Sequence, residues 1–135
     1  MKNLELGLIG TANREVMYED TAAFCDPSLP VVFSTPELLG ALEEASINAV
    51  KDCYEDGEVT VGLSADFDHM AATPVGLKVR AEAKLVKIEG IVLTFEVAAF
   101  DDKEQIAKGT HKRAIINKEK FESKLEKKNA NHISG

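Results

Sequence analysis

The sequence predicts an α+β domain in which one long helix is wrapped by an antiparallel sheet of about five strands. Three observations support this fold class. A wide apolar helical face runs from Pro36 to about Cys53. Several long stretches after residue 58 alternate between apolar and polar side chains, as half-buried strands do. A helix with so wide an apolar face has to be covered, and a sheet that curls around it provides the cover.

The chain has 135 residues, the size of one ordinary domain, so a single hydrophobic core is expected. Apolar residues make up 44% and charged residues 29%, a mix typical of a packed domain and not of a disordered chain. We expect one domain over residues 1–127, followed by a disordered tail over 128–135 that includes an inert His132.

The net charge of −7 argues against nucleic-acid binding, which needs a basic face. The charge is uneven, because residues 1–110 hold 9 basic and 20 acidic side chains while residues 111–135 hold 7 and 3. The basic C-terminal segment is compatible with a local anion-binding site. The opening MKNLELGLIG lacks the apolar run of a secretory signal, and no stretch approaches a membrane span, so a cytoplasmic protein without a membrane partner is expected.

The two cysteines, Cys25 and Cys53, are too few for a zinc site or a disulfide framework, so reduced thiols are expected. Asp66 and Asp68 have no histidine-rich cluster around them, and the glycines form no phosphate-binding loop. The sequence therefore predicts neither a metal nor a cofactor.

The elements follow in order along the chain. Residues 2–24 are interpreted as strand and turn, and Cys25–Pro30 as a loop. Pro36 fits the first turn of the long helix, with Ser34 or Thr35 as its cap. The remaining elements are predicted as strands at 59–67, 77–85, 91–100 and 105–117 and a short helix at 118–128. Dimerisation is the expected cover for the exposed edges of such a sheet.

Glu43 interrupts the apolar face of the long helix. With Leu38 at zero and about 100° per residue, its side chain falls at about 140°, between Val50 and Ile47. One interpretation is a packed stem with the carboxylate at the protein edge. The other is a cleft carboxylate that acts as a base, as a nucleophile or as the group that orients a histidine.

His69 interrupts an apolar face in the same way. In the 59–67 strand the odd-numbered residues form the apolar face and the even-numbered ones, Thr60 and Gly62 among them, the polar face. His69 continues the apolar face. A histidine satisfied by a backbone carbonyl is one interpretation, but a Glu and a His that both point toward the same core indicate an acid/base site.

Thr35 is either a helix cap or a nucleophilic or water-positioning hydroxyl. It lies eight residues, or about 12 Å of helix rise, from Glu43, so the two cannot bond directly. A shared site needs the substrate between them or recruits His69 from the same or from a second subunit. His111 and Arg113 share one face of the last strand, as a solvated pair or as an anion-binding pair.

Five short pieces of the sequence, taken together, resemble a known family, the hotdog-fold thioesterases of the fluoroacetyl-CoA thioesterase-like group. These pieces are Val32-Phe33-Ser34-Thr35-Pro36, Leu42-Glu43-Glu44-Ala45, Thr60-Val61-Gly62, His69 with Ala71-Ala72-Thr73-Pro74-Val75-Gly76, and Gly109-Thr110-His111-Lys112-Arg113. The resemblance covers nearly all of residues 4–125.

The resemblance implies a hotdog fold, a homodimer with acyl-CoA sites near the subunit interface, and hydrolysis of acyl-CoA thioesters. It places the catalytic roles on Thr35, Glu43 and His69. It places Gly62 beside the acyl pocket, and we assign Pro36 to the same substrate-binding region. His111 and Arg113 are further substrate-binding candidates, with the basic end of the chain expected to meet the phosphates of CoA.

The sequence also departs from the specialised fluoroacetyl-CoA enzyme, in which a Gly follows the Thr and an aromatic lid precedes it. Here Pro36 follows Thr35, the short Cys25–Pro30 segment replaces the lid, and there is no Trp. Hydrolysis of small acyl-CoA esters in general is therefore expected. A non-catalytic acyl-CoA or small-ligand binding protein on the same fold is the alternative, and a hotdog dehydratase is a third interpretation that no residue spacing supports.

Overall fold

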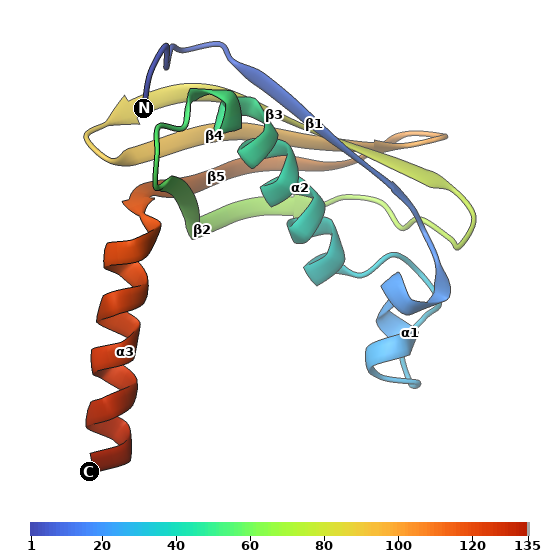
Figure 1. Cartoon of the computed structure of the whole chain (residues 1–135). Coiled ribbons are helices and arrows are strands. Elements are labelled where there is room, and N and C mark those ends of the chain that lie inside the picture. The colour runs from blue at the N-terminus through green and yellow to red at the C-terminus, as the bar shows by residue number, and fades with distance from the viewer. Residues whose placement is uncertain (135) are drawn as a thin grey trace.

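The computed structural model describes residues 1–134, the last four as backbone only, and shows a five-stranded antiparallel sheet curled over one long helix (Figure 1). The strands and helices are β1 (Ile9–Glu15), α1 (Ala22–Cys25), α2 (Thr35–Val50), β2 (Glu58–His69), β3 (Lys78–Glu89), β4 (Val92–Asp101), β5 (Gln105–Asn117) and α3 (Lys118–Ser134). The strand order is β1-β3-β4-β5-β2, so β2 forms one free edge of the sheet. The predicted α+β hotdog architecture is confirmed.

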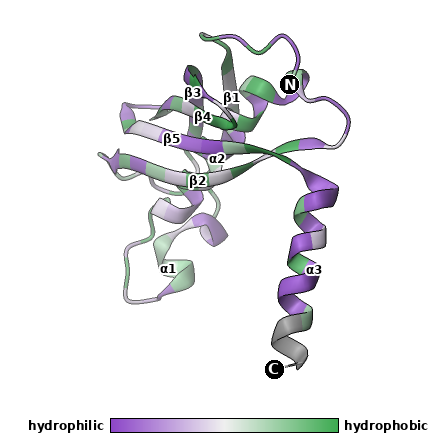
Figure 2. Cartoon of the chain, turned by 90° about the vertical axis from the view of Figure 1, so that its left-hand side faces the viewer, coloured by the Kyte–Doolittle hydropathy of each residue, from purple (hydrophilic) through white to green (hydrophobic). Residues whose placement is uncertain are grey.

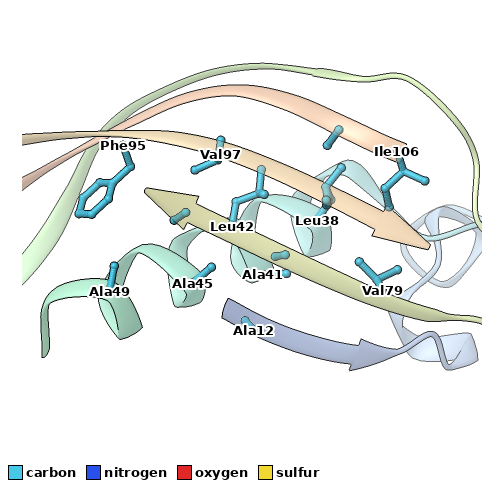
Figure 3. Packing of buried hydrophobic residues seen from close by; sticks show 14 of the residues in the cluster. Ala12, Leu38, Ala41, Leu42, Ala45, Ala49, Val79, Phe95, Val97 and Ile106 are labelled. Carbon is cyan, nitrogen blue, oxygen red and sulfur yellow. The ribbon is translucent and has the colours of Figure 1, made fainter. Parts of the chain in front are cut away.

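The core lies between α2 and the concave face of the sheet (Figure 3). Pro36 occupies the first turn of α2, whose buried face is made of small and aliphatic residues, which are Leu38, Ala41, Leu42, Ala45, Ser46, Ala49 and Val50. Gly10 on β1 allows the strand to approach the helix closely, because a Cβ there would overlap the Ala45 carbonyl and the Ala49 backbone. The regular helix ends at Val50 and a 3-10 turn completes the predicted segment to Cys53, whose side chain is buried.

The edge strand β2 differs from the regular alternation that the sequence predicts. Its pairing with β5 shifts by one residue between Gly62 and Ser64, so one extra residue is accommodated in β2 as a bulge. Before the bulge the even-numbered residues face α2, since Thr60 is buried and a Cβ on Gly62 would point at Glu43. The prediction that Thr60 and Gly62 lie on the polar face is therefore wrong.

After the bulge the odd-numbered residues of β2 face inward, as predicted. Phe67 packs against the core, and His69 is half-buried. Gly62 and His69, which would point to opposite faces of a regular strand, therefore share the face that looks toward α2. The predicted burial of Leu63 is wrong, because its side chain at the free edge is 54% exposed.

The C-terminal helix α3 extends beyond the short helix predicted over 118–128. It continues to Ser134 and projects away from the sheet (Figures 1 and 2). Most of the predicted disordered tail is therefore helical, and Gly135 lies outside the described residues. The sequence from Lys118 is rich in Lys and Glu and contains neither Gly nor Pro before residue 135, which explains why a helix continues without packing against the core.

Candidate active site

Thr35 lies at the first turn of α2 with its hydroxyl free for other contacts. Ser34 is the N-cap, because its Oγ accepts a hydrogen bond from the Glu37 backbone N–H at 3.3 Å. Thr35 is exposed to solvent, and its Oγ1 lies 2.9 Å from Nδ1 of His69. The cap interpretation of Thr35 is therefore wrong, and the hydroxyl meets an imidazole within the same chain.

His69 ends β2 and approaches the start of α2 because the bulge turns it inward. Burial lowers the pKa of His69 below its usual value, while a backbone hydrogen bond at Ala71 acts in the opposite direction. The ring is therefore neutral at pH 7 and able to accept a proton. A hollow of about 210 Å³ opens beside it, bordered by Val32, Met70, Ala71 and Ala72. A hydroxyl hydrogen-bonded to a neutral imidazole is the arrangement of a base-activated nucleophile.

Glu43 does not contact Thr35 or His69 but belongs to a separate hydrogen-bonded cluster with Arg113, His111 and Thr60. Its Oε2 accepts a hydrogen bond from Nη1 of Arg113 at 3.2 Å, with the Arg113 side chain 5% exposed and the Glu43 side chain 38% exposed. The stem of Glu43 is thus packed while its carboxylate remains open to solvent on one side. This geometry fits the first interpretation of Glu43, a packed stem with a partly exposed head, and adds a buried cation that holds the head in place.

The guanidinium of Arg113 is bonded on all three nitrogens. Nε donates to Thr60 Oγ1 at 3.0 Å, Nη2 donates to the Thr60 carbonyl at 2.8 Å, and Nη1 lies 3.2 Å from Nε2 of His111 as well as donating to Glu43. His111 and Arg113 are 3% and 4% exposed. The solvated-pair interpretation is therefore wrong, and Arg113 is not free to bind a phosphate of CoA, because its nitrogens are already occupied.

Gly62 provides space next to the Glu43 carboxylate. A Cβ at Gly62 would lie 3.0 Å from Glu43 Oε2 and 3.6 Å from both Arg113 Nη1 and His111 Cε1. Its φ is not positive, so no backbone conformation requires a glycine at this position. The missing side chain therefore leaves the space directly beside the carboxylate unfilled.

We expect Gly62→Ala to lower kcat/KM for the predicted thioester hydrolysis by about tenfold or more, because the added methyl crowds the carboxylate of Glu43, for which the sequence predicts a catalytic role. Gly40→Ala is the matched control. Gly40 lies within α2 with no atom within 4 Å of a Cβ, so that change is expected to stabilise the helix by up to about 1 kcal/mol. Steady-state kinetics and thermal unfolding of both variants check the prediction, and equal kinetics in the two would contradict it.

The structure brings together only part of the predicted site within one chain. Thr35 and His69 meet. Glu43 lies eight residues along α2 from Thr35 and is bonded to Arg113 instead. Sequence reasoning missed Thr60, the main acceptor for Arg113, because the bulge that turns it inward is not visible in the alternation. A glycine in the middle of a strand, Gly62, was the one available signal of a bulge. Pro36 is exposed beside Thr35, and its contact with a substrate remains a prediction.

Two classes of feature are absent from residues 1–134. No group of three or more His, Cys, Asp or Glu side chains is arranged to hold a metal ion in this described part of the chain. No helix in the same range is both long enough and apolar enough to cross a membrane.

Comparison with known proteins gives the family. Residues 16–119 match the model of the fluoroacetyl-CoA-specific thioesterase family. The chain belongs to this family. A fluoroacetyl-CoA thioesterase of Streptantibioticus cattleyicolor is 38% identical over 112 residues, which are 83% of this chain and 79% of that protein.

Solved structures agree with the family assignment. A structure of the fluoroacetyl-CoA thioesterase superposes with a TM-score of 0.88 at 34% identity and covers 94% of this chain and 98% of its own. A Thermus thermophilus protein described as a thioesterase superfamily member superposes with a TM-score of 0.93 over the full length of both chains. At 23% identity the Thermus protein supports the fold alone. As a member of the family, this chain is a thioesterase, a hydrolase of thioester bonds.

Proposed function

We propose that the protein hydrolyses a small acyl-CoA thioester to the free acid and CoA. The observation that supports this most directly is the 2.9 Å contact between the Thr35 hydroxyl and Nδ1 of His69. Hydrolysis of a thioester needs a nucleophile, a base that takes its proton and an acid that returns a proton to the leaving thiolate. A hydroxyl and a neutral imidazole supply all three roles.

In the proposed reaction His69 takes the hydroxyl proton as Thr35 Oγ1 attacks the thioester carbonyl. The carbon–sulfur bond breaks, His69 gives the proton to the departing CoA sulfur, and an acyl ester forms on Thr35. Water then attacks this ester with His69 again as base, which releases the acid and restores the hydroxyl. Trapping of an acyl group on Thr35 supports this route. An acyl adduct on Glu43 would indicate attack by Glu43 instead. No adduct under burst conditions would indicate direct attack by water.

A homodimer would bring Glu43 into the same site. The outer edge of β2 has no partner strand within the chain, and Leu63 is exposed along it. In such a dimer the β2 strands of the two subunits pair antiparallel about a two-fold axis near the middle of β2. The half of β2 that contains Gly62 then lies beside the half of the partner strand that ends at the partner's His69. The Glu43 carboxylate would then face a Thr–His pair across the interface. Sedimentation is expected to give twice the chain mass of 14.7 kDa.

The substrate class is tested by thiol release from short, branched and aromatic acyl-CoA esters, measured with a thiol-reactive dye. We expect turnover of at least one small acyl-CoA by the wild-type protein, and we place this activity in the cytoplasm. Saturable binding of acyl-CoA without any thiol release would contradict hydrolysis and would support the alternative, a non-catalytic binding protein on the same fold.

A further inference from the structure

His111 lies at the far end of a chain of hydrogen bonds that leads to the Glu43 carboxylate. Its Nδ1 is 2.8 Å from the Ser64 carbonyl, and its Nε2 is 3.2 Å from Arg113 Nη1. The same Nη1 donates to Glu43 Oε2 at 3.2 Å. Ser64 directly follows the bulge that places Gly62 against Glu43. His111 thus links the bulged edge strand to the arginine that holds Glu43.

These contacts define the protonation of the ring. A backbone carbonyl only accepts hydrogen bonds, so Nδ1 carries a proton and donates it to Ser64. A guanidinium only donates, so Nε2 is unprotonated and accepts from Arg113. Nη1 has two hydrogens, one for Glu43 and one for His111, and the two acceptors together fix its direction.

We propose that His111 is a positioning residue for Glu43. Its neutral ring accepts the second Nη1 hydrogen bond of Arg113, which fixes the Glu43 carboxylate beside Gly62. Protonation of the ring releases this arrangement. A protonated ring would turn Nε2–H toward a donor and place two cations 3.2 Å apart. The proposal uses the proposed function only for the role of Glu43, since the hydrogen bonds exist whether or not Glu43 acts on a thioester.

The groups around His111 favour its neutral form. Burial lowers the pKa of His111, and the positive charge of Arg113 lowers it further, whereas the Ser64 hydrogen bond and the negative charge of Glu43 raise it. Arg113 is on the same strand and Glu43 is on α2, while β2 presents the Ser64 carbonyl and β4 pairs its apolar Phe95 with His111. The net effect is a pKa below the usual value, so the ring is neutral at pH 7.

The first test is the dependence of kcat on pH. If His69 and His111 must both be neutral, log kcat is level above the ordinary histidine pKa of about 6.5 and falls at lower pH, with a limiting slope of 2 once the pH is below both lowered pKa values. His111→Gln offers an amide donor and acceptor without a titration, so it is expected to keep kcat within about fivefold at high pH and to reduce the slope to 1. His111→Leu, which offers neither, is expected to lower kcat by about 10- to 100-fold with little change in KM.

A limiting slope of 1 for the wild type below both pKa values, or equal kcat for the wild type and a folded His111→Leu variant, would overturn the proposal. Circular dichroism at each pH excludes unfolding as the cause of the acid limb. Nitrogen-15 NMR of the wild-type ring gives a second measurement that needs no activity. The expected spectrum at pH 7 is that of a neutral ring protonated at Nδ1, and a ring protonated at Nε2 or a cation would contradict it. A wild type that releases no thiol counts against the proposed function alone, and the NMR result still decides the placement of His111.

Discussion

His69→Ala is expected to lower kcat by about 10³-fold, within the range of 10² to 10⁴ that a positioned base contributes. The variant removes the ring that lies 2.9 Å from the Thr35 hydroxyl. Thr35→Ala is expected to cause a loss of similar size. Because the two side chains act as a unit, the double variant is expected to be little worse than either single one.

Thr35→Ser is the matched control for this pair. Serine keeps the hydroxyl, so it is expected to retain most of the activity that Thr35→Ala loses. Single-turnover kinetics with the best acyl-CoA substrate and thermal unfolding of each variant make the comparison. Fully additive losses in the double variant would mean that Thr35 and His69 act independently, and an unchanged kcat in His69→Ala would exclude this histidine as the base.

Glu43→Gln is expected to lower kcat by about 100-fold or more while the protein remains folded. The amide oxygen still accepts from Arg113, so the packing is preserved and only the negative charge is lost. Glu44→Gln is the matched control one residue along α2, since Glu44 is exposed and forms a surface ion pair with Arg14. Equal kinetics of the two variants would show that the charge of Glu43 has no part in the reaction.

Mixing the two inactive variants tests whether the site is shared between subunits. When His69→Ala and Glu43→Gln subunits assort at random, half of the dimers are heterodimers, and a shared site leaves each of these with one complete set of residues. About a quarter of the wild-type activity is then expected to return. If Glu43 and His69 of the same chain form one site, no complete set exists in any dimer, and the mixture stays inactive.

Much of the fold is predictable from local patterns. The apolar face of α2 and the alternation in β3 and β4 are set by side-chain periodicity, which depends only on the sequence. The C-terminal helix was underestimated because a polar segment without a packed face gives no periodic signal, although its composition favours a helix. The edge strand β2 is predicted correctly as a strand. The predicted face of the side chains in its first half is wrong, because one extra residue in the bulge reverses every side chain that precedes it.

The candidate site divides in the same way. The sequence by itself determined that Glu43 and His69 interrupt apolar faces and that Thr35 starts the helix, and the resemblance gave these residues a common chemistry. Only the tertiary structure decided which groups meet. The bulge in β2 places Gly62 and His69 on one face, and burial between α2 and β5 turns Arg113 from a presumed surface cation into the partner of Glu43. Such pairings depend on strand register and on contacts between distant segments, which no local pattern contains.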